Sequence, residues 1–488
     1  MKKTCVVWLL LGSALLLLPQ IIFAQKVKTV PFSYLPDDSE DRYHQRIAKK
    51  TLPLNEQEFL ILSRKGAGEY AVDRYNQDLE LKWSAALPLP EGHTLEAFAL
   101  QPQAALVVTH KKPGSDGLQA LFAHQIDINT GKVLQTQKLM EAPGRSRRMN
   151  VSISEDGSQI AVYRYTTNNE HQIRAMQAAV YNASLKKQLE RTYDFSDIKG
   201  YLTPYVHIDN QGDQYVSILS DNATKMTVRR YQNSTDEVKV MTVMVGGLFS
   251  GKTIKVFDVQ FTLNQEKALF AAMLCVDEQT GNYFSLKAVR FDFEANDMLF
   301  AEEFRFTDQY LKDLQKLAAN KSETPQRLSD IYLTELVLTP DKDFIVMAER
   351  KYTEGGENSP YVARELHLIT YDEFLNPAWR SIIMKSQTAP ASEAFSGISY
   401  RSRLFGSELH ILTLETLNNK NDLYLRRINT RTGATSEAPK AIGLNVANDK
   451  NIAYVKDFTA WLNEKNIITV IRPVKKSAGL QLSRITIK

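Results

Sequence analysis

Short apolar stretches separated by polar turns recur along most of the chain, and this alternation predicts β-strands. Each copy has a strand, a polar turn and a second strand rich in Val, Ile, Leu, Tyr and Phe, as in "SISEDGSQIAVYRY" and "LTPDKDFIVMAERKY". β-Branched and aromatic residues favour strands, whereas Gly, Asn, Asp and Pro favour turns. The turns fall near Asn55, Pro102, Asp156, Asn210, Asn264, Asp341, Gly406 and Asn463. Their spacing of roughly 50 residues is typical of β-propeller blades.

A second repeated pattern lies between these units. Three segments align without gaps: "YNQDLELKW" from Tyr75, "YNASLKKQL" from Tyr181 and "YDEFLNPAW" from Tyr371. We interpret the Tyr as the end of one strand. The Asn or Asp then opens a turn, because its side chain can bond the backbone two residues further on. The Leu at the fifth position is expected to enter the next strand, which the Trp or Leu at the ninth position continues.

These patterns predict an all-β fold, a β-propeller with eight four-stranded blades. A four-stranded unit cannot bury both of its faces alone, so the units are expected to close into a ring. Seven blades is the alternative, should one weak unit prove irregular. The last unit contains only three strands, and "QKVKTVPFSY" near the N-terminus offers the fourth. Pairing that strand with the last unit would close the ring and remove an exposed edge.

The strand-turn-strand units also carry a resemblance to a known class of protein. "SEDGSQIAVY" and "TPDKDFIVM" resemble the repeats of exported bacterial β-propellers, such as the periplasmic Tol-type propellers. The resemblance covers the repeat units and is generic, since it consists of one turn between two strands. It implies the fold and no activity, because propellers host binding modules and several enzyme classes alike.

One segment interrupts the strand pattern. In "TDQYLKDLQKLAANKSETPQRLSD", residues 307–330, apolar residues recur at helical spacing and Thr307 or Asp308 can cap the helix. We expect a short helical insertion whose apolar stripe packs on the propeller. A partner-binding helix is the alternative.

The N-terminus predicts export. "MKKTCVVWLLLGSALLLLPQIIFAQ" has a basic start, an uncharged apolar core and Ala24 before a plausible cleavage point. The apolar run is shorter than the ~20 residues of a membrane span. Residues 1–24 are therefore predicted to be a signal peptide, and 25–488 a single propeller domain. The expected location is the bacterial periplasm or the cell exterior, with no integral membrane segment after cleavage.

The net charge and the cysteine content limit the kinds of partner and of covalent cross-link expected for the mature chain. Loss of Lys2 and Lys3 lowers the formal charge of +4 by the two lysine charges, to +2, so no strong field favours nucleic acid or an anionic membrane. Loss of Cys5 leaves Cys275 as the one cysteine, so the fold is expected to rest on its core without an internal disulfide.

"VGGLFSGKT" matches the phosphate-binding loop of nucleotide hydrolases, with Gly246, Gly251, Lys252 and Thr253 at the required positions. Such a loop needs a helix directly after it, whose N-terminus helps to bind the phosphates. "TIKVFDVQFTL" follows instead, with the alternation of a strand. We therefore reject a nucleotide hydrolase.

Two function classes remain. The first is a non-catalytic propeller that binds a cell-envelope protein or glycan; the second is an exported glycosidase or lyase with carboxylates at the central channel. Polar candidates on the expected inner strands are His207, Asp258, Glu335, Arg401 and Asp457. The set is small for catalysis, so the sequence favours binding. It contains no close spacing typical of a metal site, and we expect no cofactor and no metal.

Overall fold

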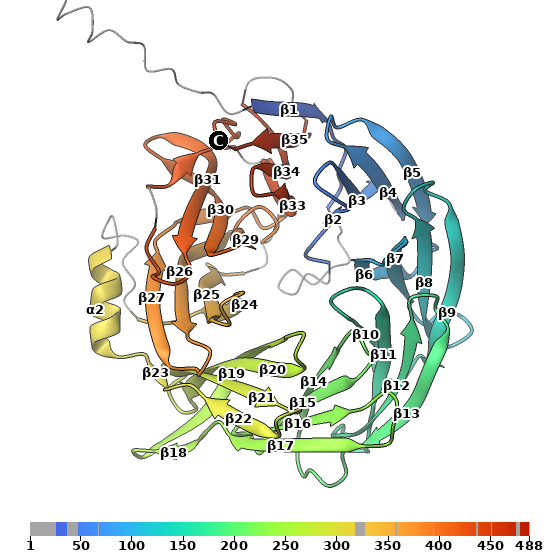
Figure 1. Cartoon of the computed structure of the whole chain (residues 1–488), viewed down its shortest axis with the longest axis vertical. Helices are drawn as coiled ribbons and strands as arrows, with labels where there is room; N and C mark the ends of the chain where they lie inside the picture. The colour runs from blue at the N-terminus through green and yellow to red at the C-terminus, as the bar shows by residue number, and fades with distance from the viewer. Residues whose placement is uncertain are drawn as a thin grey trace, which may run out of the picture.

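Eight β-sheets are arranged around a central axis like the blades of a propeller (Figure 1). The computed structural model describes residues 26–487 apart from 37–46, 67, 318–326, 357–358, 394, 436–437, 450 and 475–478. Each blade has four main antiparallel strands, and two blades carry short additional strands. The predicted all-β propeller with eight blades is therefore confirmed, and the alternative of seven is not.

We number the blades in chain order and give the strands of each from the innermost outward. The first four blades contain β2 (Thr51–Pro53), β3 (Glu58–Gly66), β4 (Glu69–Asn76) and β5 (Leu81–Pro88); β6 (His93–Leu100), β7 (Ala104–Lys111), β8 (Leu118–Asp127) and β9 (Val133–Pro143); β10 (Asn150–Ile153), β11 (Gln159–Thr167), β12 (Ile173–Asn182) and β13 (Lys187–Asp194); and β14 (Thr203–Ile208), β15 (Gln214–Ser220), β16 (Lys225–Tyr231) and β17 (Val238–Met244).

The last four blades contain β19 (Lys252–Leu263), β20 (Ala268–Asp277), β21 (Tyr283–Asp292) and β22 (Asp297–Phe300), with β18 (Gly247–Phe249) and β23 (Phe304–Arg305) added; β24 (Ile331–Leu338), β25 (Phe344–Thr353), β26 (Tyr361–Tyr371) and β27 (Pro377–Ile383), with β28 (Gln387–Ala389) added; β29 (Tyr400–Phe405), β30 (Glu408–Leu417), β31 (Lys420–Asn429) and β32 (Lys440–Ala441); and β33 (Tyr454–Asn463), β34 (Asn466–Ile471), β35 (Gln481–Thr486) and β1 (Lys26–Pro31).

The hydrophobic core is divided among the interfaces between neighbouring blades. Each of the eight interfaces holds its own cluster of buried apolar side chains. The middle strand β20 is buried along its whole length, as expected for a strand covered on both faces. Since each blade packs on two neighbours, the ring is the smallest unit in which every blade is covered.

The N-terminal strand closes the ring as predicted. β1 pairs antiparallel with β35, from Lys26 opposite Thr486 to Pro31 opposite Gln481, and becomes the outermost strand of blade 8 (Figure 1). Val27 packs into the core between blades 7 and 8, while Val30 and Phe32 pack into the core between blades 8 and 1. The two ends of the described chain therefore share one blade.

The repeated Asn or Asp forms the predicted turn. The Oδ1 atom of Asn182 accepts hydrogen bonds from the backbone N–H groups of Ser184 and Lys186, both at 3.0 Å. Equivalent bonds form at Asn76 and Asp372.

The expectation that the Leu of this motif enters the next strand is wrong. Leu79, Leu185 and Leu375 lie within the turn at φ values of 62°, 57° and 62°. Their side chains are nevertheless buried in the cores between blades. A residue with a Cβ atom rarely adopts this conformation, so burial of the side chain outweighs the backbone cost.

The Trp of the motif joins one blade to the next. The Nε1 atom of Trp379, at the outer strand of blade 6, donates to the carbonyl of Thr430 at 2.6 Å. The Trp379 ring also covers Gly433, where an added Cβ would lie 2.5 Å from the ring. Trp83 makes the equivalent contacts with Ile128 and Gly131 of blade 2.

The glycine-rich segment belongs to blade 5. β18 and β19 pair across it, and Lys252 is the first residue of β19. The segment after Thr253 is therefore a strand, as the alternation predicted, and the helix that a phosphate-binding loop requires does not follow it.

A short helix lies outside the ring beside β26 and β27 (Figure 1). α2 (Asp308–Leu317) begins after Thr307, whose Oγ1 atom accepts a hydrogen bond from the Tyr310 N–H at 3.2 Å. Tyr310 and Leu314 are buried, and the Tyr310 hydroxyl lies 2.6 Å from Nδ1 of His367 on β26. The apolar stripe of this helix thus packs on the propeller. The rest of the insertion, 318–326, lies outside the described residues.

The predicted signal peptide, 1–24, also lies outside the described residues. Within the part that is described, the structure has no helix with the length and apolar character of a bilayer span.

Candidate functional site

All five polar residues predicted for the channel lie on the innermost strands. His207 is on β14, Asp258 on β19, Glu335 on β24, Arg401 on β29 and Asp457 on β33. They come from blades 4 to 8, one from each. Their role depends on what they contact.

Four of them make polar contacts between neighbouring blades. Asp258 Oδ2 accepts a hydrogen bond from the Leu333 N–H of blade 6 at 2.7 Å, and Ser402 of blade 7 donates to Glu335 of blade 6. The Arg401 guanidinium lies 3.2 Å from Asp457 Oδ1 of blade 8. These contacts fix the order and spacing of the blades around the axis.

Arg401 and Asp457 are the only two of the five that these contacts bring together. The Arg401 Nε atom donates to the Lys456 carbonyl at 2.9 Å, and Lys50 Nζ lies 3.8 Å from Asp457 Oδ2. His207 instead packs against Phe261 at a ring distance of 5.3 Å, and burial lowers its pKa to about 4. It is therefore neutral at pH 7. These contacts link the residues to neighbouring blades and not to one another, apart from Arg401 and Asp457.

Two further ionisable groups, one on β33 and one in the loop before β29, were not anticipated. Burial lowers the pKa of Lys456 to about 8, and its ammonium group donates to the carbonyl of Phe395. Burial also raises the pKa of Glu393, in the loop before β29, to about 7. No local sequence pattern marks these two groups, because a loop folds onto blade 8 beside them. The Lys456 N–H donates a hydrogen bond to the Ser396 carbonyl of this loop at 2.9 Å.

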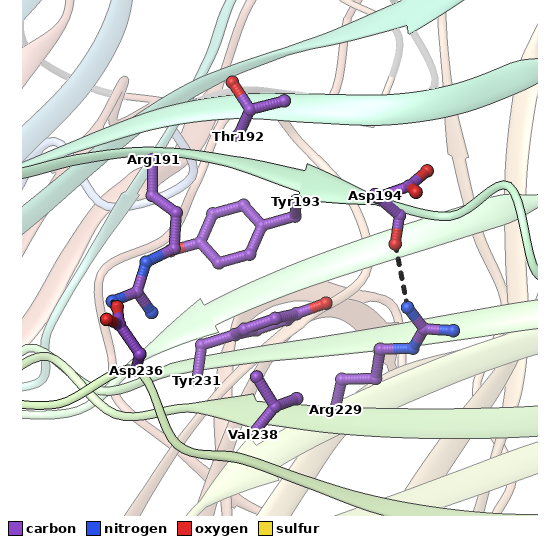
Figure 2. A pocket seen from close by; sticks show the side chains of 8 residues that line it. All are labelled: Arg191, Thr192, Tyr193, Asp194, Arg229, Tyr231, Asp236 and Val238. Carbon is purple, nitrogen blue, oxygen red and sulfur yellow. Dashed lines mark hydrogen bonds and ion pairs between the residues drawn. The ribbon is translucent and has the colours of Figure 1, made fainter.

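A depression of about 440 Å³ lies at the outer rim between blades 3 and 4 (Figure 2). It is lined by Arg191, Thr192, Tyr193, Asp194, Arg229, Tyr231, Asp236 and Val238. Its floor is aromatic: the rings of Tyr193 and Tyr231 lie 4.1 Å apart between centroids, at an interplanar angle of 62°. Both tyrosines are almost fully buried.

Two arginines flank this aromatic floor (Figure 2). Arg191 donates to the Thr235 carbonyl at 3.0 Å, and Arg229 to the Asp194 carbonyl at 2.9 Å. Each also pairs with an exposed carboxylate, Arg191 with Asp236 at 2.6 Å and Arg229 with Asp197 at 2.5 Å. The carbonyl contacts hold both guanidinium groups at the rim.

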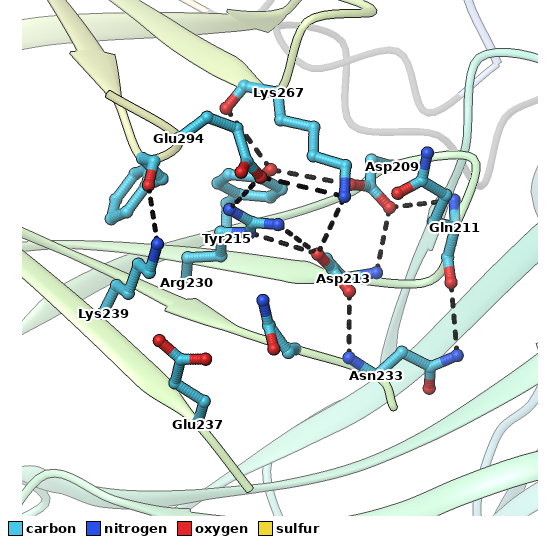
Figure 3. Close-up of polar contacts among 12 residues, drawn as sticks. Asp209, Gln211, Asp213, Tyr215, Arg230, Asn233, Glu237, Lys239, Lys267 and Glu294 are labelled. Atoms are coloured by element: carbon cyan, nitrogen blue, oxygen red, sulfur yellow. Dashed lines mark hydrogen bonds and ion pairs between the residues drawn. The ribbon is translucent and has the colours of Figure 1, made fainter. Parts of the chain in front are cut away.

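A buried network fixes the strand that carries Arg229. The next residue, Arg230, points to the opposite face of β16 and is 1% exposed. Its guanidinium donates to Asp213 Oδ2 from Nε at 3.1 Å and Nη2 at 2.7 Å, and to Glu294 of blade 5 at 2.7 Å (Figure 3). Lys267 Nζ completes the cluster at 3.8 Å from Asp213. The position of this network between blades 4 and 5 indicates a structural role.

The outer edge of blade 4 lies beside the rim depression. β17 pairs with β16 alone among the described strands, so its other side is an edge. Its exposed positions are Val238, Val240, Thr242 and Met244, and the exposed fractions of the three apolar side chains are 42%, 55% and 62%. We call this row of four residues the β17 edge.

The β17 edge differs from the outer strands of the other seven blades. Each of those strands exposes at least one charged side chain, such as Lys82 on β5, Lys138 on β9, Glu190 on β13, Asp297 on β22, Arg380 on β27, Lys440 on β32 and Lys28 on β1. Exposed charges on edge strands prevent unwanted pairing with other chains. The β17 edge lacks this protection.

No protein-family model and no curated protein matches the chain. Similar solved structures include prolyl oligopeptidase B from Galerina marginata, with 9% identity and a TM-score of 0.42 over 88% of this chain and 56% of that one. They also include an oligogalacturonate lyase in complex with manganese, with 10% identity and a TM-score of 0.38 over 95% and 98% of the two chains. The β-propeller domain of the Trilobed protease from Pyrococcus furiosus has 10% identity and a TM-score of 0.36 over 80% and 93%. The chain spans just over half of the prolyl oligopeptidase. At these values the likeness concerns the fold alone, and the chain itself is an eight-bladed β-propeller by its own strand pairing.

Proposed function

We propose that this protein is an exported, non-catalytic propeller of the cell envelope that binds a partner protein at the rim of blade 4. In this proposal an extended segment of the partner pairs with β17 as an additional strand. The observation that carries it is the exposed, uncharged β17 edge, in a ring whose other outer strands all expose charge.

Strand addition fits the chemistry of this edge. The backbone groups on the open side of an edge strand can pair with an incoming strand, which provides affinity. Every second side chain of that strand would then pack beside Val238, Val240 and Met244, which provides selectivity for apolar residues.

The rim depression would receive one acidic side chain of the same segment. Val238 lines the depression and begins β17, so the two surfaces are continuous. The present carboxylate partners of Arg191 and Arg229 are highly exposed, at 101% for Asp236 and 67% for Asp197. Exposed ion pairs contribute only about 0–1 kcal/mol, so a ligand carboxylate can replace either partner at little cost.

The test uses short random peptides selected by display on the wild-type protein. The selected peptides should alternate apolar residues and carry an Asp or Glu near one end. Fluorescence anisotropy should then show that Val240→Lys weakens binding at least tenfold, about 1.4 kcal/mol. The matched control is Ala86→Lys, which places the same charge at an exposed position of β5 and should leave the affinity unchanged.

Backbone methylation of the peptide tests the mode of binding. Methyl groups on alternate backbone nitrogens block strand pairing and leave the side chains intact, so they should abolish binding. Equal affinity of the peptides for wild type and Val240→Lys would refute the β17 site. Binding of envelope glycans without any peptide binder would replace the protein ligand with a glycan.

The second candidate function is an exported glycosidase or lyase. It is favoured by Glu393 and Lys456, whose pKa values burial moves toward neutrality. Such shifts are common in active sites, although structural groups show them too. A turnover assay on envelope polysaccharides distinguishes the two proposals, since an enzyme would lose activity in Glu393→Gln and a binding protein would show none in either form.

A further inference from the structure

Two neighbouring blades bring three metal-ligand side chains together. Glu408 and His410 lie two residues apart at the start of β30 in blade 7, so they share one face of that strand. Glu464 lies in the turn between β33 and β34 of blade 8. One ligand atom from each of the three residues lies within 4.8 Å of the other two.

The spacing of the first two ligands matches a coordinated ion. His410 Nε2 lies 3.4 Å from Glu408 Oε2. That distance is long for an N–H···O hydrogen bond, which is usually 2.9–3.0 Å. Two ligands at about 2.0–2.1 Å from a tetrahedral zinc ion are separated by about 3.3–3.4 Å.

The imidazole is buried, and its Nε2 atom faces Glu408. The His410 side chain is 0% exposed, and its Nδ1 atom has no hydrogen-bond partner within the described part of the chain. Phe405 packs against the ring at a centroid distance of 5.1 Å and restricts its orientation.

The charges around the imidazole include two carboxylates and one guanidinium group. Two carboxylates face the imidazole, and the positive charge of Arg427 opposes a second cation there. Neutral imidazole and carboxylate are the ligand types that zinc takes up in proteins.

We propose that Glu408, His410 and Glu464 bind one divalent transition-metal ion, best matched by Zn²⁺, with water in the remaining position. Because the ligands come from blades 7 and 8, the ion would join the blade that β1 completes to the blade before it. This site is independent of the proposed binding function at blade 4.

The experiment is a calorimetric titration of ZnCl₂ into the full chain, produced without a histidine tag and treated with a chelator. We expect binding of one ion per chain and a higher melting temperature with Zn²⁺ than with Mg²⁺ or Ca²⁺. Glu464→Gln should weaken zinc binding more than about tenfold, since even residues that only support metal ligands contribute that much. Glu464 is exposed, so this variant keeps the fold.

The matched control is Glu266→Gln, which changes an exposed glutamate in the corresponding turn of blade 5 and should bind zinc like the wild type. Co²⁺ bound to wild type should show the visible absorption of a tetrahedral site, and His410→Gln should abolish it. Absence of stoichiometric binding, or equal zinc affinity of Glu464→Gln and wild type, would overturn the proposal.

Discussion

At the scale of single residues, three leucines adopt a left-handed backbone conformation that the sequence does not predict. Leu79, Leu185 and Leu375 have positive φ values and buried side chains. The left-handed conformation costs roughly 1–2 kcal/mol for a residue with a Cβ atom. Burial of a leucine side chain contributes about 1.5–3 kcal/mol, which offsets that cost.

The sequence revealed the motif around these leucines but not their conformation. The Asn or Asp that opens the turn has a local signal, because its side chain bonds the following backbone. The position of Leu185 is set by the core between blades 2 and 3, which is formed by strands distant in sequence. No local sequence pattern indicates a core that is formed by such distant strands.

We expect Leu185→Ala to lower the free energy of unfolding by about 2–5 kcal/mol, although the residue lies in a turn. The reason is the cavity left between blades 2 and 3. Leu134→Ala, at a position of β9 that is 56% exposed, serves as the control and should change stability by less than about 0.5 kcal/mol. Urea denaturation of the two variants measures the difference, and similar midpoints would contradict the structural role of the turn.

Glu393 should make stability depend on pH. Burial raises its pKa from 4.5 to about 7, Arg472 opposes this rise, and Asp449 adds to it. The folded state therefore favours the protonated acid, and wild-type stability should fall as the pH rises from about 4.5 to about 7.

Glu393→Gln is neutral at every pH and should lack this component. Its stability relative to wild type should increase across the same range by up to about 3 kcal/mol. Denaturation midpoints of both proteins at several pH values provide the measurement. A constant difference between them would mean that Glu393 ionises in the fold as easily as in the unfolded chain.

At the scale of strands and turns, contacts between elements determine which face of a strand is buried and which residues pair, and the hydrophobic pattern of the sequence does not. In "VKVMTVM", both alternating sets of residues are mainly apolar. The sequence therefore predicts a strand but not which set faces water, and the structure exposes Val238, Val240 and Met244. The channel candidates were chosen as the polar residues of the expected inner strands, whereas their partners belong to other blades.

The contact between Trp379 and Gly433 yields a prediction at this scale. Gly433 has a φ of 70°, and an added Cβ would lie 2.5 Å from the Trp379 ring. Gly433→Ala should cost roughly 1–2 kcal/mol for the conformation and about 1–3 kcal/mol more for the clash. Gly281→Ala is the control, because Gly281 has a φ of 68° in the turn between β20 and β21 of blade 5, with no atom within 4 Å of the added Cβ.

Thermal unfolding compares the two alanine variants. Gly433→Ala should melt lower than Gly281→Ala, and both should melt below wild type. Equal melting temperatures would show that the indole moves aside without cost and does not connect the blades rigidly.

At the scale of the whole molecule, the ring depends on six residues at one end of the described chain. β1 forms the outer strand of blade 8 and contributes Val27 and Val30 to two interblade cores. Each lost backbone hydrogen bond costs about 0.5–1.5 kcal/mol, and each apolar side chain that becomes exposed costs roughly 1.5–3 kcal/mol. The sum is comparable with the 5–15 kcal/mol that stabilises a typical domain.

Deletion of residues 26–31 should therefore lower the melting temperature strongly or cause aggregation, because β35 would become an unprotected edge. Replacement of Lys26 and Lys28 by Ser is the control, since both side chains are exposed and the strand pairing remains. A truncated protein that melts with the wild type would show that β1 is not needed to hold blade 8 in the ring.

The pairing of β1 with β35 also determines when blade 8 can be completed during synthesis of the chain. β1 is the first of the described strands to be synthesised and β35 the last, so β1 stays unpaired until β35 has been made. A chain that stops before Gln481 has every earlier strand and still cannot cover Val27 or Val30. The ring can therefore close only when the last strand has been made. A truncated chain would leave an apolar strand exposed, by which a chaperone or protease can recognise it.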